Sequence, residues 1–209
     1  GTDRTYSMDS LPQELSCYGN GDFRSASLML ENGDGSMSCD MRYKNYTIRD
    51  GKYSLPGLPA VYADNDEAQT LEIVLEDPAT GVEAMLLYGV LPELDIITRS
   101  VYIRNQSSEK IYVNKVMSAE LDFLYGDYDL LTFYGRHAME RNLQRVPVAH
   151  GSQMIGSVRG TSSHQYNPMM ILAEKDTTED HGGCYAMSFV YSGNFQGEVL
   201  KDQYNQTRM

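Results

Sequence analysis

The sequence consists largely of short runs in which polar and apolar residues alternate, and this pattern constrains the fold more than any other feature. The segment TLEIVLE places Leu71, Ile73 and Leu75 at every second position, which is the period of a strand with one buried face. The turn sequence Asp77–Gly81 follows, so the next run is predicted to return as the paired strand. Since no amphipathic helical pattern longer than about 12 residues occurs, the chain is predicted to be all-β, an antiparallel sandwich with few or no helices.

Turn sequences bound further runs of strand length. The consecutive turn dipeptides in Asn32–Gly35 predict a hairpin between the run before them and the run that resumes at Met37. Two segments are predicted to be loops: Leu55–Asn65 contains Pro56 and Pro59, and Tyr125–His137 is aromatic and acidic. The predicted strands are Ala26–Glu31, Met41–Arg49, Thr70–Glu76, Val82–Val90, Ile96–Arg104, Ile111–Phe123, Met169–Ala173 and Tyr185–Tyr191.

Length and charge narrow the classes of partner. The 209 residues suit one domain, 1–209, which can bury a substantial core. With 17 basic against 29 acidic residues, the net charge of −12 disfavours nucleic acid and anionic membrane surfaces as partners. The sequence contains no run of about 18 apolar residues, and its first twenty residues lack the pattern of a signal peptide. A cytoplasmic protein with no membrane span is therefore predicted.

The three cysteines, Cys17, Cys39 and Cys184, match no metal or redox motif in their spacing. Free, buried or half-buried thiols in a reducing compartment are predicted, and a Cys17–Cys39 disulfide in a secreted protein is the alternative. The segment Gly19–Arg24 has Arg24 where a dinucleotide fingerprint needs its third glycine, and no Walker loop occurs. No cofactor and no metal site are predicted.

Two pairs of carboxylates have the spacing that would bring them together on a strand, Asp127 with Asp129 and Glu120 with Asp122. Paired carboxylates carry out glycoside hydrolysis, but one of them needs a raised pKa and neither pair shows a sequence reason for it. Exposed charge at strand ends is therefore predicted for both pairs. The four histidines are dispersed and are predicted to be structural.

Two polar and aromatic segments remain as candidate binding loops. Residues Tyr134–Arg141 combine a tyrosine with arginines and a histidine, and Gly160–Gln165 is rich in hydroxyl groups. Tyrosine rings pack on the apolar faces of sugars, and guanidinium groups hydrogen-bond to hydroxyls and carboxylates. These loops predict binding of a polar, neutral ligand or of a partner loop.

Nine collinear motifs resemble the N-terminal domain of glycoside hydrolase family 36 α-galactosidases, over about residues 3–209. The motifs are Arg4–Ser7, Leu11–Glu14, Gly21–Arg24, Leu58–Ala60, Ala68–Leu75, Ile97–Ser100, Tyr134–Arg141, Arg159–Pro168 and Phe189–Phe195. The resemblance implies a β-supersandwich of the galactose-mutarotase-like kind. In the family this domain precedes a (β/α)8 barrel and a C-terminal β domain, and two barrel aspartates carry out retaining hydrolysis.

The resemblance therefore implies that the chain holds no catalytic residue and hydrolyses nothing alone. Since the chain begins without a methionine and stops without a closing turn, it is expected to be a truncated N-terminal sandwich domain that lacks the barrel and the C-terminal β domain. The whole protein is expected to hydrolyse terminal α-D-galactosyl residues of oligosaccharides. A stand-alone carbohydrate-binding or structural β-sandwich module is the alternative.

Two residues receive a substrate-binding role from the resemblance. Tyr134 occupies the position of a family aromatic residue, usually Trp, that reaches the galactose subsite. Arg4 matches an arginine that reaches the substrate pocket of a neighbouring subunit in family tetramers, and Asp3 is a weaker candidate beside it. The expected partners are an α-galactoside, the barrel of the same chain and further copies of the protein.

Overall fold

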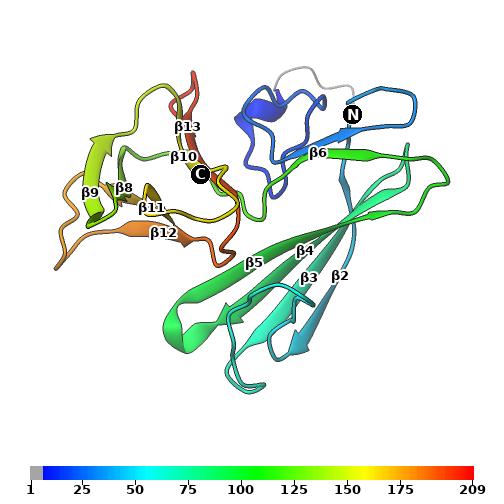
Figure 1. Ribbon diagram of the computed structural model, residues 1–209. Helices are drawn as coiled ribbons and strands as arrows, with labels where there is room; N and C mark the ends of the chain where they lie inside the picture. Colours follow the sequence, from blue (N-terminus) through cyan, green and yellow to red (C-terminus); the bar gives the residue numbers. More distant parts are fainter. Residues whose placement is uncertain (1–6) are drawn as a thin grey trace. The chain divides into compact units, whose positions relative to one another are not determined.

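The computed structural model describes residues 7–209 as strands and loops (Figure 1). Within these residues the only helices are two short 3-10 turns, η1 (Met8–Ser10) and η2 (Pro92–Leu94). All the strand pairs within the sheets are antiparallel, so the predicted all-β class is confirmed. No helix in the described part is long and apolar enough to span a bilayer. The chain divides into a first unit, residues 7–56 with 61–120, and a second unit, 57–60 with 121–209.

The first unit contains a four-stranded meander and a two-stranded ribbon. The order in the meander is β2-β3-β4-β5, and Leu75 lies opposite Ala84 as the turn at Asp77–Gly81 predicts. The ribbon pairs β1 with β6 and sets Leu28 opposite Val116. The bounds are β1 (Leu28–Glu31), β2 (Arg42–Asp50), β3 (Gln69–Asp77), β4 (Val82–Leu91), β5 (Ile96–Asn105) and β6 (Tyr112–Val116).

The core of the first unit forms because alternate residues of the ribbon and the meander face each other. Leu28 and Leu30 of β1 pack in one buried cluster with Ala84 and Leu86 of β4. Leu28 and Leu86 are 0% exposed, so the period-two pattern of the sequence decides which side chains fill this core.

The second unit contains two four-stranded sheets, β12-β11-β8-β9 and β10-β13-β14-β7. Leu130 of β8, Leu172 of β11 and Val199 of β13 form the centre of its core. The bounds are β7 (Asp122–Phe123), β8 (Tyr128–Arg136), β9 (Met139–Pro147), β10 (Gly151–Ser157), β11 (Tyr166–Glu174), β12 (Cys184–Ser188), β13 (Phe195–Lys201) and β14 (Thr207–Arg208).

Three local predictions were wrong. The turn at Asn32–Gly35 exists, but β1 pairs with the distant β6 and the segment after Met37 does not form the returning strand. The predicted strand Ile111–Phe123 is interrupted, because β6 ends at Val116 and β7 begins at Asp122 in the other unit. The segment Tyr125–His137, predicted as a loop, contains the nine-residue strand β8.

Candidate functional site

Tyr134 lies near the end of β8, where the buried face of the strand meets solvent. Tyr128, Leu130 and Thr132 precede it on the same face and are buried, since side chains two apart on a strand point the same way. Tyr134 continues this face beyond the core and is 43% exposed. Its backbone pairs with Asn142 of β9 on one side and with Tyr166 of β11 on the other. Strand pairing therefore holds the backbone of Tyr134 on both sides, while its ring is half exposed.

The hairpin between β8 and β9 closes tightly around Gly135. Asn142 Nδ2 donates hydrogen bonds to the carbonyl oxygens of Tyr134, at 3.2 Å, and of Met139, at 3.0 Å. A Cβ atom at residue 135 would lie 2.3 Å from the carbonyl oxygen of Met139 and 2.8 Å from Glu140 Cα. Because both obstacles are backbone atoms, only glycine fits here without moving the partner strand.

We expect Gly135→Ala to destabilise the chain by about 1–3 kcal/mol, the usual cost of forcing extra volume into a packed position. The measurement is the midpoint of urea unfolding, monitored by the circular dichroism of the tyrosines. Gly33→Ala is the control, because its added Cβ would lie 3.3 Å from Glu109 Cβ and 3.4 Å from the carbonyl oxygen of Lys110, contacts that need a shift of only a few tenths of an ångström. Equal midpoints for the two variants would show that the hairpin has room at residue 135.

The loop Gly160–Gln165 lies against the end of β8. The amide of Gly135 donates to the carbonyl oxygen of Gln165 at 3.1 Å. At the other side of the loop, the amide of Gly160 donates to Asn194 Oδ1 at 2.6 Å, and the amide of Ser162 donates to the carbonyl oxygen of Ser192 at 2.8 Å. The structure therefore brings together the motifs Tyr134–Arg141, Arg159–Pro168 and Phe189–Phe195, which lie apart in the sequence.

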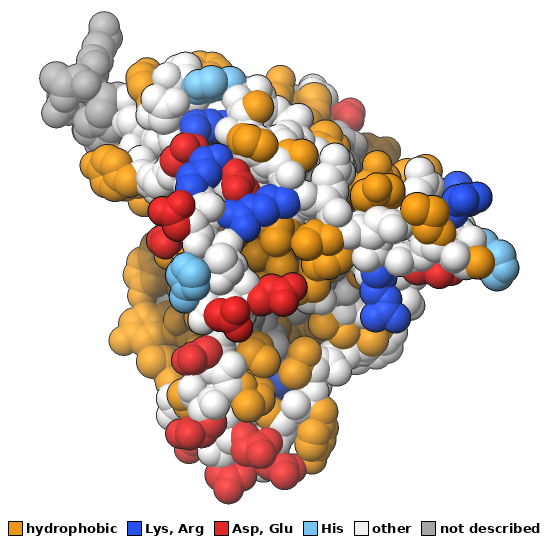
Figure 2. Space-filling view, turned by 90° about the vertical axis from the view of Figure 1, so that its left-hand side faces the viewer, with side chains coloured by type: hydrophobic (Ala, Val, Ile, Leu, Met, Phe, Trp, Pro, Cys, Tyr) orange, Lys and Arg blue, Asp and Glu red, His pale blue; other side chains and the backbone are white. Residues whose placement is uncertain are grey.

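We define a loop cluster as residues 134–141, 158–165 and 189–195, and it contains exposed apolar and aromatic side chains. Val158 is 93% exposed and Tyr191 is 43% exposed. The ring of Phe189 meets the Tyr191 ring edge to face, with centroids 6.0 Å apart. Many hydrophobic side chains also lie among polar ones on the face drawn in Figure 2. The loop cluster thus offers exposed rings to a polar, neutral ligand or to another protein surface.

The second substrate-binding candidate cannot be placed beside Tyr134. Arg4 and its neighbour Asp3 lie outside the described residues 7–209. Sequence reasoning missed Asn194 and Gln165 as partners of the Tyr134 strand, although both lie inside the motifs that carry the family resemblance. The pattern around these residues gives no sign of a contact that uses backbone amides.

The carboxylate pairs weighed for acid–base chemistry are all engaged in ionic or hydrogen-bonded contacts. Hydrogen bonds from Lys175, at 2.6 Å, and from Arg145, at 2.8 Å, hold the pKa of Asp129 below its usual range, and the bond from Lys175 has the larger effect. Asp127 lies 3.4 Å from Lys201 and is 64% exposed at its side chain. This arrangement keeps Asp129 ionised, whereas a general acid needs a raised pKa.

The pair Glu120 and Asp122 departs from the prediction of exposed charge. Glu120 is 4% exposed, and its Oε2 accepts hydrogen bonds from the amide and hydroxyl of Ser16 and from the hydroxyl of Ser27. The Asp122 side chain is 2% exposed and forms an ion pair with Arg208. Both carboxylates are therefore structural groups, buried where the chain passes from one unit to the other in sequence.

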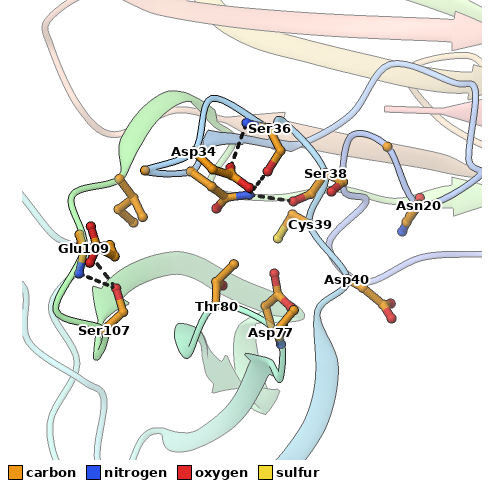
Figure 3. A pocket seen from close by; sticks show the side chains of 15 residues that line it. Asn20, Asp34, Ser36, Ser38, Cys39, Asp40, Asp77, Thr80, Ser107 and Glu109 are labelled. Carbon is orange, nitrogen blue, oxygen red and sulfur yellow. Dashed lines mark hydrogen bonds between the residues drawn. The ribbon is translucent and has the colours of Figure 1, made fainter.

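A separate cavity of about 860 Å³ lies in the first unit among several turns (Figure 3). The carboxylates of Asp34, Asp77 and Glu109 line it from different turns, and among residues 7–209 no lysine or arginine lines it. Hydrogen bonds from Ser36 hold the pKa of Asp34 below its usual value. This charge makes the cavity unfavourable for anions. Tyr134 is not among the residues that line it.

Cys39 also lines this cavity and lies close to Cys17 in the core of the first unit. Both are buried free thiols, so the disulfide alternative is wrong. Cys184 is also a free thiol but is exposed, so the prediction of a buried or half-buried side chain holds for Cys17 and Cys39 and is wrong for Cys184. A hydrogen bond between the two side chains raises the pKa of Cys39 and lowers that of Cys17. Within residues 7–209 no three His, Cys, Asp or Glu side chains are grouped to hold a metal ion.

Antiparallel sheets with exposed aromatic loops, in which the carboxylate pairs considered above form structural contacts, are compatible with a binding or assembly domain, and the fold alone does not assign a function. The model for the glycosyl hydrolase family 36 N-terminal domain matches residues 1–209. The chain therefore belongs to this family, as its sequence motifs predict.

Alpha-galactosidases of known sequence align with this chain over its whole length. The bifunctional alpha-galactosidase/sucrose kinase AgaSK of Mediterraneibacter gnavus is 59% identical over 209 residues, which are 100% of this chain and 22% of that protein. Alpha-galactosidase AgaA of Geobacillus stearothermophilus is 41% identical over 209 residues, 29% of its length. The chain thus spans between a fifth and a third of these relatives.

Solved structures confirm the fold. The galactosidase domain of AgaSK superposes with a TM-score of 0.97 at 60% identity and covers 100% of this chain and 29% of that one. A GH36 alpha-galactosidase AgaA from G. stearothermophilus, determined in complex with raffinose, superposes with a TM-score of 0.96 at 42% identity, over 99% of this chain and 29% of that one. The sandwich implied by the family resemblance is therefore the observed one.

Proposed function

We propose that this chain is the N-terminal domain of a retaining α-galactosidase that releases terminal α-D-galactosyl residues from oligosaccharides. The observation that carries the proposal is the match of the family model to all 209 residues. Relatives at 59% and 41% identity are alpha-galactosidases, and each is several times longer than this chain. The family resemblance assigns the two carboxylates, which retaining enzymes hold about 5 Å apart, to a barrel outside this sequence.

Within that enzyme the chain shapes the rim of the substrate pocket with Tyr134 and, from a neighbouring subunit, Arg4. The half-exposed ring of Tyr134 supports this role, because a tyrosine ring packs on the apolar face of a sugar while its hydroxyl stays wet. The AgaA complex with raffinose supports an α-galactoside as the ligand class. By the family resemblance, Tyr134 stands where most members have tryptophan, and its ring offers a smaller stacking surface to the sugar than an indole ring would.

The chain is also proposed to contact the barrel of the same protein and further copies of it, in a tetramer. Exposed apolar side chains near the loop cluster support a protein partner, since Leu143 is 56% exposed and Val190 is 50% exposed. A cytoplasmic location is part of the proposal. The closely placed free thiols of Cys17 and Cys39 fit a reducing compartment.

The test is Tyr134→Ala in the full-length protein, with an aryl α-galactoside as substrate. Loss of about 1 kcal/mol of ring contact is expected to lower kcat/KM roughly fivefold, mainly through KM. Tyr125→Ala is the matched control, because Tyr125 lies in the same unit, is 85% exposed and is assigned no ligand. An unchanged KM in Tyr134→Ala, or an equal effect in the control, would remove Tyr134 from the substrate site.

The isolated chain separates this proposal from a stand-alone carbohydrate-binding module. We expect no turnover of the aryl α-galactoside by the purified chain and no saturable binding of galactose. Turnover beyond that of a mock purification would contradict the assignment of catalysis to the barrel. Saturable galactose binding that disappears in Tyr134→Ala would favour the carbohydrate-binding module.

A further inference from the structure

Beyond Thr132, the ladder between β8 and β11 continues at Tyr166 and at the residue before it, Gln165. Strand pairing joins Tyr134 to β9 and β11, and the next residue, Gly135, donates its amide to the carbonyl oxygen of Gln165 at 3.1 Å. The register with β11 is irregular between Tyr166 and Met170, so these last rungs are separated from the regular part of the ladder. The position of the end of β8 therefore depends in part on the loop that supplies the Gln165 carbonyl.

That loop is closed across its two ends. Arg159 Nη2 donates to Gln165 Oε1 at 3.1 Å, and the hydroxyl of Ser157 donates to the carbonyl oxygen of Thr161 at 2.6 Å. These bonds lie within the loop and at its junctions with β10 and β11. A contact to a different segment adds a further point of attachment.

Asn194 supplies this contact. Its Oδ1 accepts the Gly160 amide at 2.6 Å, and beside it the Ser192 carbonyl accepts the Ser162 amide at 2.8 Å. The Asn194 segment leads directly into β13, so the loop is attached to the second sheet of the unit. A continuous path of hydrogen bonds and backbone runs from Asn194 through Gly160 and Gln165 to Gly135.

We propose that Asn194 is a positioning residue for Tyr134: it anchors the loop 159–165, which in turn fixes the end of β8. The inference rests on the proposed substrate role of Tyr134. A side chain that must meet a sugar ring gains affinity when its backbone is held before binding. Asn194 itself touches no ligand in this proposal.

The experiment uses the full-length protein and an aryl α-galactoside. Asn194→Ala is expected to raise KM about two- to fivefold, no more than Tyr134→Ala, with kcat nearly unchanged, because ground-state and transition-state contacts of the ring are weakened together. Asn194→Asp keeps the oxygen acceptor and is expected to restore KM. Gln153→Ala is the matched control, since Gln153 Oε1 also accepts a backbone amide, that of Ala149 at 3.0 Å, away from Tyr134.

Two further readouts separate a positioning role from general destabilisation. In the Tyr134→Ala background, Asn194→Ala is expected to add no further increase in KM. By hydrogen exchange, the amides of Gly160 and Gly135 are expected to exchange faster in Asn194→Ala and to recover in Asn194→Asp. Unchanged exchange at Gly135, or an undiminished KM effect in the double variant, would overturn the inference.

These readouts also separate the inference from the proposed function. If Tyr134→Ala leaves KM unchanged, the substrate role of Tyr134 is wrong and so is the effect of Asn194 on substrate. Hydrogen exchange at Gly135 still decides whether Asn194 holds the strand end. If Tyr134→Ala raises KM and Asn194→Ala does not, the proposed function stands and the positioning role is wrong.

Discussion

Replacing Asp122 with alanine is expected to destabilise the second unit by about 3–5 kcal/mol, because it removes the carboxylate that pairs with a buried guanidinium. Arg208 Nε and Nη2 each donate to one carboxylate oxygen of Asp122 at 2.7 Å. The side chain of Asp122 is 2% exposed and that of Arg208 is 6% exposed, so water cannot replace the lost carboxylate. The pair joins the edge strand β7 to its neighbour β14.

Urea unfolding of the chain, monitored by the circular dichroism of its tyrosines, measures this loss of stability. Asp127→Ala is the matched control: it removes a carboxylate that is 64% exposed, and exposed ion pairs contribute about 0–1 kcal/mol. In the double variant Asp122→Ala with Arg208→Met, we expect part of the stability to return, since the buried guanidinium is removed together with the carboxylate that pairs with it. Equal midpoints for Asp122→Ala and Asp127→Ala would contradict the buried ion pair.

The strands that the sequence predicts are those whose two faces differ. Leu71, Ile73 and Leu75 alternate with polar neighbours, and β3 forms where this pattern lies. In β8 the outward-facing positions include Leu131 and Phe133, so apolar residues occupy both faces and hide the period of two. Residues 125–137 therefore looked like an aromatic loop although nine of them pair in a sheet.

Long-range pairing lies beyond what local patterns contain. The turn Asn32–Gly35 is correctly predicted, yet β1 takes β6 as its partner, because Leu28 and Leu30 must face the core that β4 completes. Hairpin rules describe neighbours in sequence and cannot choose between neighbours in space. The partner of a short strand is decided by burial across the whole unit.

The candidate site is predictable only in part for a similar reason. The family resemblance supplied Tyr134, and its half exposure at the end of β8 agrees with a residue that meets a ligand. The contacts that hold it join Gly135 to Gln165 and Gly160 to Asn194, and three of these four groups are backbone amides or carbonyls. Since every residue except proline carries such an amide, residue types alone do not reveal these contacts.

Replacing Glu120 with alanine is expected to destabilise the first unit by about 3 kcal/mol, because several buried donors lose one common acceptor. Glu120 Oε2 accepts the Ser16 amide at 3.3 Å and the Ser16 hydroxyl at 2.5 Å, and the Ser27 hydroxyl donates to the same atom. Ser16 is 0% exposed and lies 104 positions away in sequence. The carboxylate therefore ties the segment before β1 to the end of the first unit.

The midpoint of urea unfolding again measures the loss of stability, and two further variants serve as comparisons. Glu120→Gln keeps an oxygen acceptor of the same shape and is expected to lose less stability than Glu120→Ala. Glu109→Ala removes an exposed carboxylate of the same unit and is expected to stay within about 0.5 kcal/mol of the wild type. If Glu120→Ala matched Glu109→Ala, the serine hydroxyls and the Ser16 amide would have found other acceptors. A large loss confined to Glu120→Ala would show that one buried carboxylate oxygen closes the first unit.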